Sequence, residues 1–206
     1  TAMETVPSPD VGPVHKLGVI TALRSWRADL KIYEFRVETE GEIVPLPELQ
    51  TIYKSGSATT HTYRIPALLV SKKGTILAFA EARRNSGSDT ANIDTVVRRS
   101  EDGGKSWGDE IIVSDERDNV AGNPCPVVDQ STGRIWSLQT WNSHKVHENQ
   151  TKAGFGEDSR RGFITYSDDD GKSWAKAKEI TRSAKQKHWS WYATGPGAGI
   201  QLQRGK

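Results

Sequence analysis

An all-β fold made of many short strands is the fold class that this sequence predicts. Eight short runs beyond residue 60 are rich in strand-forming residues and are separated by Gly, Asn, Asp and Lys turns, whereas few segments show the period of a helix. An eight-residue pattern, S-x-D-x-G-x-x-W, occurs at 100–107 and again at 167–174, so the chain contains an internal repeat. These features are typical of a sandwich, a barrel or a propeller.

The expected elements begin before residue 60. Residues 31–38, KIYEFRVE, alternate apolar and polar side chains and are predicted to form a strand. The two prolines of 44–49, VPLPEL, indicate a linker, and we place a domain boundary between residues 46 and 47. The strand-like runs that follow are 63–71, 75–83, 95–102, 111–114, 126–129, 134–141, 162–169 and 197–203.

The repeated pattern predicts a compact hairpin turn. In each copy the aspartate can accept hydrogen bonds from backbone N–H groups of its own turn, and the glycine can adopt a positive φ. The tryptophan is then expected to fold back and fill the space between neighbouring sheets; stacking against a sugar ring is the alternative. These residues are Asp102, Gly104 and Trp107 in the first copy and Asp169, Gly171 and Trp174 in the second.

Composition excludes several classes of function. A formal net charge of +2 without a long Lys/Arg block argues against a nucleic-acid partner. No run of about 18 apolar residues predicts a membrane span, and the start, TAMETVPSPD, reads as a processed or engineered end rather than a signal peptide. Cys125 is the one cysteine, so neither a disulfide nor a cysteine-based metal site is expected. His144 and His147 lack a framing carboxylate motif, and we expect no metal and no cofactor.

Arg64 is the most unusual residue of the strand-like runs. It lies within TYRIPALL, residues 62–69, between a tyrosine and an apolar stretch that should enter a core. Burial of a charge there is costly unless an anion compensates it. Arg64 is therefore a candidate for binding an anion, with a structural ion pair to a nearby carboxylate as the alternative.

Five motifs in order resemble one family. The pattern at 100–107 and 167–174 resembles the Asp-box of sialidase-type β-propellers, and YRIP (63–66) looks like the [FY]-R-I-P motif of exo-sialidases. The segments AFAEAR, NPCP and WYATGPGAGIQL are similar to family segments in the same order; they span residues 78–83, 123–126 and 191–202. From about residue 50 to residue 206 the chain resembles the bacterial exo-α-sialidases of glycoside hydrolase family 33.

The resemblance implies a six-bladed β-propeller, of which residues 47–206 would hold the first two to three blades. Residues 1–46 would be the end of an accessory β-domain and the linker. The family's tyrosine nucleophile, its glutamate base and two further arginines lie beyond the matched segment. We therefore expect a fragment that is inactive alone, that has the missing C-terminal part of the same protein as a partner, and that is secreted or periplasmic.

Site residues follow from the same resemblance. Arg64 would bind the carboxylate of sialic acid, because a planar guanidinium can hold a carboxylate with two charge-assisted hydrogen bonds. Arg83, rather than its neighbour Arg84, would assist from the carboxylate side. Asp89, in a turn-like segment, would be the general acid/base that protonates the leaving oxygen. Asp94 is its rival, and a structural hydrogen bond is the other interpretation of that residue.

Asn123 would line the pocket near the 4-hydroxyl or N-acetyl group, and capping a turn before a proline is an equally good interpretation. The implied function is the hydrolysis, with retention, of terminal α-linked sialic acid from glycans or glycoproteins. Two alternatives share these residues: a glycan-binding propeller without turnover, and a trans-sialidase that passes the sugar to an acceptor.

Overall fold

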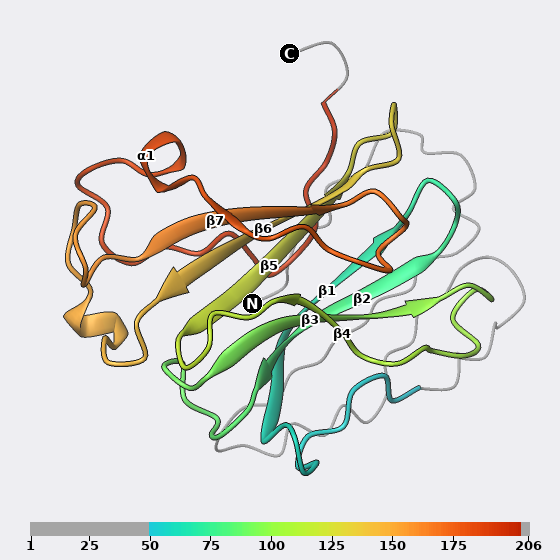
Figure 1. The fold of residues 1–206 in the computed structure, drawn as a ribbon, viewed down its shortest axis with the longest axis horizontal. Coiled ribbons are helices and arrows are strands. Elements are labelled where there is room, and N and C mark those ends of the chain that lie inside the picture. Colours follow the sequence, from blue (N-terminus) through green and yellow to red (C-terminus); the bar gives the residue numbers. More distant parts are fainter. Residues whose placement is uncertain (1–49, 203–206) are drawn as a thin grey trace, which may run out of the picture. The chain divides into compact units, whose positions relative to one another are not determined.

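Two four-stranded antiparallel sheets lie next to each other in the computed structural model, which describes residues 50–202 (Figure 1). The first sheet is a meander in which each strand pairs with the next along the chain. Its strands are β1 (Thr62–Val70), β2 (Ile76–Arg83), β3 (Ile93–Ser100) and β4 (Ile111–Ser114). β-branched residues are frequent in β3 and β4, as a pleated and half-buried surface favours, whereas β2 is rich in alanine.

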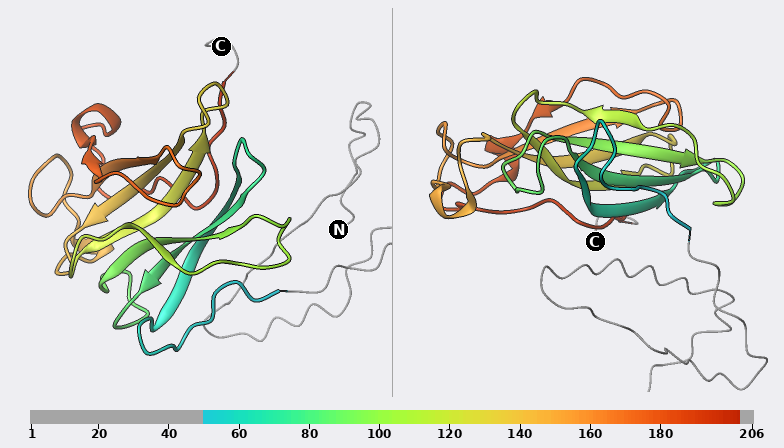
Figure 2. Two further views of the ribbon diagram at one scale, coloured as in Figure 1. Left: turned by 45° about the vertical axis from the view of Figure 1, so that its right-hand side comes forward. Right: turned by 90° about the horizontal axis from the view of Figure 1, so that it is seen from below.

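The second sheet repeats this arrangement. It contains β5 (Val120–Val128), β6 (Ile135–Asn142), β7 (Arg161–Ser167) and the short β8 (Lys178–Glu179), again paired in chain order. One parallel bridge, between Ile93 and Val120, links the two sheets, and Figure 2 shows them side by side from two further directions. The sheets are two blades of a β-propeller, as the sequence predicts.

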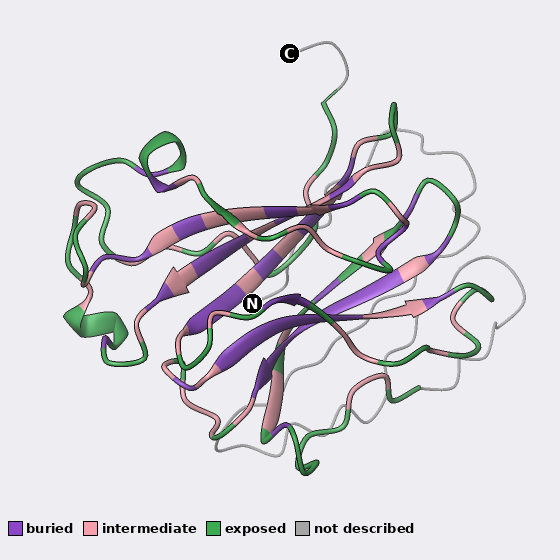
Figure 3. Ribbon diagram, in the orientation of Figure 1, coloured by how far each residue is buried: buried purple, intermediate pink, exposed green. Residues whose placement is uncertain are grey.

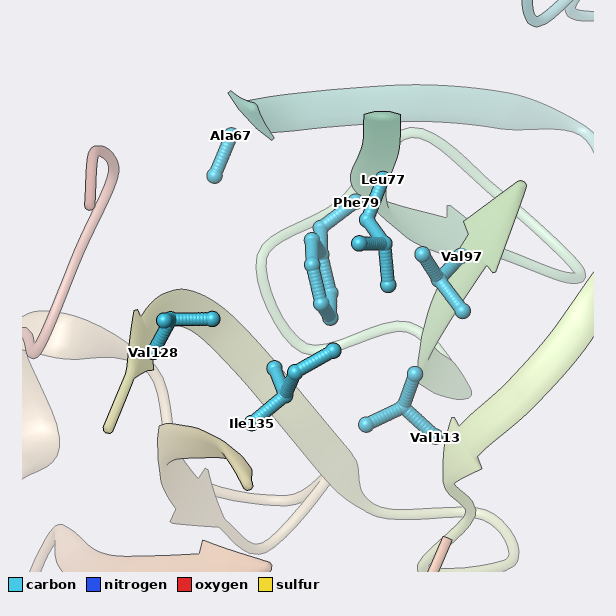
Figure 4. Close-up of a cluster of buried hydrophobic side chains, with 7 residues drawn as sticks. All are labelled: Ala67, Leu77, Phe79, Val97, Val113, Val128 and Ile135. Atoms are coloured by element: carbon cyan, nitrogen blue, oxygen red, sulfur yellow. The ribbon is translucent and has the colours of Figure 1, made fainter. Parts of the chain in front are cut away.

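An apolar core fills the space between the two blades (Figure 4). Five of its residues come from the first blade and two from the second: Ala67, Leu77, Phe79, Val97 and Val113, and Val128 and Ile135. Burial is deepest along β2, β3 and β5, which are mostly purple in Figure 3. Each large side chain buried in this way stabilises the fold by about 1.5–3 kcal/mol, so this core stabilises the packing of the two blades against each other.

Both repeats form the predicted turn, and both lie between the third and fourth strands of their blades. The Asp102 and Asp169 carboxylates each accept a 2.9 Å hydrogen bond from a backbone N–H four residues later. Gly104 and Gly171 have φ values of +91° and +82°. The turn prediction is confirmed because local hydrogen bonding and glycine geometry determine it.

The second turn also ties the blades together. The Trp174 ring meets Phe79 of the first blade edge-to-face, with centroids 5.6 Å apart. Asp170 accepts a 2.6 Å hydrogen bond from the hydroxyl of Thr75, and the Arg99 Nε donates to the backbone oxygen of Asp170 at 2.8 Å. The expectation that the repeat tryptophan packs between sheets is therefore correct for this copy.

Two expectations about elements differ from the structure, and two fall outside the described residues. Residues 197–202 do not form a strand; one backbone hydrogen bond, from Gly199 N–H to the Pro126 oxygen, joins them to β5. Strand β5 begins six residues earlier than expected, at Val120, because its bulge accommodates Pro124. The predicted strand at 31–38 and the accessory β-domain lie outside the described residues.

Helices are few and short in the described part. They are η1 (Glu148–Gln150) and α1 (Thr181–Ala184), and neither is long and apolar enough to cross a membrane. The strand registers bring the start of β1, the end of β2 and the starts of β3 and β5 to the same end of the two blades. The candidate site residues lie at this end.

Candidate active site

Arg64 lies at a bulge in β1. The pairing with β2 is regular up to Arg64 opposite Glu81, and it shifts before Ala67. Ile65, inside the bulge, has a φ of +53°, which is rare for a β-branched residue and marks strained backbone. The Arg64 side chain is 44% exposed, so the expectation of a buried charge is wrong: the bulge and the edge position of β1 leave it open to solvent.

Arg83 is the last residue of β2, and its side chain is 3% exposed. Its Nη2 lies 2.7 Å from the Oε2 of Glu81, and its Nη1 donates to the Gly87 oxygen at 2.7 Å. Residues two apart on a strand share one face, so Glu81 and Arg83 meet within β2. This buried ion pair holds the guanidinium in one orientation.

Asp89 lies in the turn between β2 and β3 and is 63% exposed. Its Oδ1 is 3.0 Å from the Nη1 of Arg64 and 2.7 Å from the Nη2 of Arg83. The structure thus brings Arg64, Arg83 and Asp89 together, and we call these three residues the arginine–aspartate cluster.

The arginine–aspartate cluster can bind a carboxylate. Two guanidinium groups converge on one carboxylate oxygen, and charge-assisted hydrogen bonds of this kind are among the strongest in proteins. The more buried guanidinium, Arg83, acts in a medium of lower dielectric than water, where its attraction for an anion is greater. The more exposed one, Arg64, is reachable from solvent.

Asp94 and Arg84 form a separate pair. The Arg84 Nε donates to the Asp94 Oδ2 at 2.6 Å, and its Nη1 reaches Glu110 at 3.1 Å. Burial raises the pKa of the Asp94 carboxyl, and the hydrogen bond from Arg84 partly offsets this. Arg84 follows the end of β2 and contacts Asp94 and Glu110, whereas Arg83 contacts Glu81 and Gly87. The structure does not bring Asp94 into the arginine–aspartate cluster.

Asn123 joins the cluster through Glu81. Its backbone N–H donates to the Glu81 Oε1 at 2.9 Å, so one buried carboxylate contacts both Arg83 and Asn123. Asn123 lies in a bulge of β5 with a φ of +53°, which repeats the geometry of Ile65 before a proline in β1. Its side-chain oxygen accepts a 2.8 Å hydrogen bond from the Thr140 hydroxyl.

Two buried residues at this site are absent from the sequence-based prediction. Glu81 is 2% exposed; a charge inside the apolar run AFAEAR is the signal that could have found it. Arg160, just before β7, is 3% exposed and donates to the side-chain oxygens of Asn142 and Asn123. Its sequence context, SRRG, contains no signal that separates it from a surface arginine. Residues 50–202 contain no group of three side chains that could hold a metal ion.

Comparison with known proteins finds a matching family model and several similar proteins. A family model described as a BNR repeat-like domain matches residues 74–206. An Aspergillus fumigatus protein named exo-alpha-sialidase is 34% identical over 165 residues, which cover 71% of this chain and 40% of that protein. Rat sialidase-3 is 35% identical over 164 residues, covering 76% of this chain and 39% of the relative. The chain therefore spans about two fifths of the length of these relatives.

A solved structure has the same fold. The microbial sialidase named Hadza microbial sialidase Hz136 superposes with a TM-score of 0.66 at 29% identity, covering 70% of this chain and 31% of that one. The partial coverage agrees with two blades of a larger propeller.

Proposed function

Because the chain belongs to the BNR repeat-like domain family, we propose that it carries the substrate-carboxylate site and the proton donor of an exo-α-sialidase. The reaction would release terminal α-linked sialic acid from glycans or glycoproteins, with retention. The names of the relatives support this reaction, and the geometry of the arginine–aspartate cluster supports the roles of individual residues.

One observation carries the proposal: two arginines from different strands converge on one carboxylate oxygen at an exposed turn. Sialic acid bears a carboxylate on its anomeric carbon, so a substrate would offer the same group that Asp89 offers here. Arg83, held by Glu81 and the Gly87 oxygen, would supply a fixed contact. Arg64 would approach from the solvent side.

Asp89 would move a proton. When the substrate carboxylate binds Arg64 and Arg83, it would replace the Asp89 carboxyl at both arginines, and Asp89 could then face the glycosidic oxygen. It would donate its proton to this oxygen as the bond to the anomeric carbon breaks and the tyrosine nucleophile, which the family resemblance places beyond the matched segment, bonds to that carbon. It would then take a proton from the water that displaces the tyrosine. Its place in an exposed turn suits this role, because the leaving group of an exo-acting enzyme extends into solvent.

Asn123 would hold the sugar on the other side of Glu81. Its backbone is fixed by the Glu81 carboxylate and its side-chain oxygen by Thr140, which leaves the amide NH₂ to donate to a hydroxyl or carbonyl oxygen of the sugar. A secreted or periplasmic location suits glycoprotein substrates, and we include it in the proposal.

The test is the release of sialic acid from 3′-sialyllactose by the complete protein, followed by chromatography of the products. Free sialic acid is the expected product. Arg64→Met should abolish its release, whereas Arg134→Met, the matched control at the opposite end of the second blade, should not. This difference would link the release of sialic acid to the arginine–aspartate cluster. Transfer to added lactose would identify a trans-sialidase instead. Binding of 3′-sialyllactose without any product would leave only a glycan-binding role.

A further inference from the structure

Arg160 is a buried cation that the proposed reaction does not use. Its Nη1 donates to the Asn142 Oδ1 at 3.0 Å, and its Nη2 donates to the Thr140 hydroxyl at 2.7 Å and to the Asn123 Oδ1. The guanidinium carbon lies 3.7 Å from the centre of the Trp191 ring. Within residues 50–202 its hydrogen-bond acceptors are thus amide and hydroxyl oxygens.

The charge of Arg160 persists despite this burial. Desolvation lowers the pKa of the Arg160 guanidinium to about 10, and the Glu81 carboxylate partly offsets that effect. The side chain is therefore a cation at neutral pH, with every N–H group a donor. A cation held in this way without a contacting carboxylate is costly, so its retention calls for a role beyond packing.

Arg160 determines which way the Asn123 amide points. A guanidinium can only donate hydrogen bonds, so the atom of Asn123 that faces it must be the oxygen. Thr140 favours the same orientation of the Asn123 amide. Its hydroxyl oxygen accepts a hydrogen bond from Arg160, so its hydroxyl hydrogen is donated to the Asn123 oxygen. The Asn123 NH₂ group must point the other way, and it finds no acceptor among the described side chains and backbone.

We propose that Arg160 is a positioning residue, which fixes the Asn123 amide with its oxygen inward so that its NH₂ group donates to an acceptor oxygen of the bound sugar. This inference rests on the proposed function. It identifies the substrate group that faces the Asn123 amide as a hydrogen-bond acceptor, such as a hydroxyl or amide carbonyl oxygen. The preference for an acceptor is then set by Arg160, which does not itself touch the sugar.

The same contacts link Arg160 to the arginine–aspartate cluster. Asn123 is bound on its side-chain oxygen by Arg160 and on its backbone N–H by Glu81, and Glu81 in turn holds Arg83. The Thr194 hydroxyl also donates to the Asn123 backbone oxygen at 2.6 Å. Asn123 is therefore fixed at three atoms, and one atom, Nδ2, is left for the substrate.

The kinetic test uses the complete protein and 4-nitrophenyl α-sialoside. We expect Arg160→Met to raise KM by about tenfold, the value of one well-placed hydrogen bond to a fixed group, with kcat changed less than about threefold. Arg160→Lys keeps one donor toward Asn123 and should recover part of the KM. Arg134→Met, which removes an arginine from the opposite end of the second blade, should leave KM unchanged.

Two further variants separate positioning from folding. Asn123→Asp gives Arg160 a carboxylate partner, so the melting temperature should not fall, yet KM should rise because an acceptor replaces the donor. In an Asn123→Ala background, Arg160→Met should have no additional effect on KM. An unchanged KM in Asn123→Asp, or full additivity of Arg160→Met and Asn123→Ala, would overturn the proposal.

A measurement without substrate keeps the inference independent of the activity. The ¹³Cγ resonance of Asn123 reports hydrogen bonding to its oxygen, and Arg160→Met should shift it while leaving the backbone resonances of β1 and β2 in place. If the wild-type protein releases no sialic acid but this shift is seen, the proposed function fails and the positioning of Asn123 stands. An unshifted ¹³Cγ resonance would refute the positioning itself.

Discussion

The Oε2 of Glu81 lies 2.7 Å from the Nη2 of Arg83, and both side chains are 3% exposed. Because the pair is formed within one strand, its geometry is fixed by the pleat of β2 rather than by a mobile loop. The other oxygen of the same carboxylate, Oε1, accepts the backbone N–H of Asn123 from the second blade. Glu81 therefore sets the distance between the two halves of the candidate site.

Glu81→Gln should destabilise the fold. An amide cannot neutralise Arg83, which then keeps only the exposed Asp89 carboxylate as its partner, and breaking a buried ion pair by removing one partner costs on the order of 3 kcal/mol. Denaturant unfolding of this chain measures the loss. Glu101→Gln is the matched control, since Glu101 pairs with Arg99 while 65% exposed, and an exposed pair contributes at most about 1 kcal/mol. Equal losses in the two variants would contradict a special role for Glu81.

Gly122→Ala should displace the same carboxylate. A Cβ at residue 122 would lie 2.5 Å from the Glu81 Oε1 and 3.3 Å from a Val120 methyl group. The carboxylate cannot move away without losing its hydrogen bonds, so we expect a loss of about 1–3 kcal/mol in the free energy of unfolding, typical of overpacking. Gly156→Ala, where no heavy atom lies within 4 Å, should be close to neutral in the same measurement.

Asp169 should make stability depend on pH in the acid range. Burial works against its charged form, but hydrogen bonds from Ser173, Ser167 and backbone N–H groups outweigh this and lower the pKa of Asp169 to about 2. Since the unfolded value is about 4, the folded state binds fewer protons between these two pH values. Its contribution to stability is therefore complete above about pH 4 and is lost as the pH falls toward 2.

Asp169→Asn tests this dependence. The gap in the free energy of unfolding between wild type and variant should be constant above about pH 4 and should narrow below it. Ser173→Ala removes the hydroxyl that donates to Asp169 at 2.5 Å and should reduce the gap. A gap that stays constant down to pH 2 would mean that the turn does not hold a charged Asp169.

Asp89→Ala should affect substrates according to their leaving groups. A proton donor matters most when the leaving oxygen is basic, so turnover of 3′-sialyllactose should fall by about 10² or more, and turnover of 4-nitrophenyl α-sialoside should fall far less. Steady-state kinetics of the complete protein on both substrates gives the comparison. Asp118→Ala, a change at an exposed turn before β5, should leave both rates unchanged. If Asp89→Ala lowered the turnover of both substrates equally, that result would argue against proton donation by Asp89.

Local patterns predicted most of the fold. The two S-x-D-x-G-x-x-W turns depend on hydrogen bonds within eight residues, so the sequence alone predicts them. The structure adds that each lies between the third and fourth strands of its blade. The start of β5 was not predictable in this way. The unpredicted part, residues 120–125, contains Gly122 and Pro124, which argue against a strand, yet the bulge at Asn123 accommodates them.

The sequence predicted only those site residues that lie in or near a recognisable motif. Arg64, Arg83 and Asp89 come together because β1 and β2 pair in register and the turn after β2 folds back. Arg160 was not predictable, because its contacts to Asn123 and Asn142 span more than 15 residues and depend on the register of β6 with β7. The structure was also needed to show that Asp89, and not Asp94, lies beside Arg83, because both aspartates follow Arg83 closely in the sequence.

The most direct test of the carboxylate site compares a sialoside with its methyl ester. The complete protein would be titrated calorimetrically with methyl α-sialoside and with the same sugar esterified at C1, for wild type and for Arg64→Lys. We predict that wild type binds the free acid at least about 10²-fold more tightly, in line with two charge-assisted hydrogen bonds, and that Arg64→Lys loses most of this preference. Equal affinities of wild type for acid and ester would contradict the account.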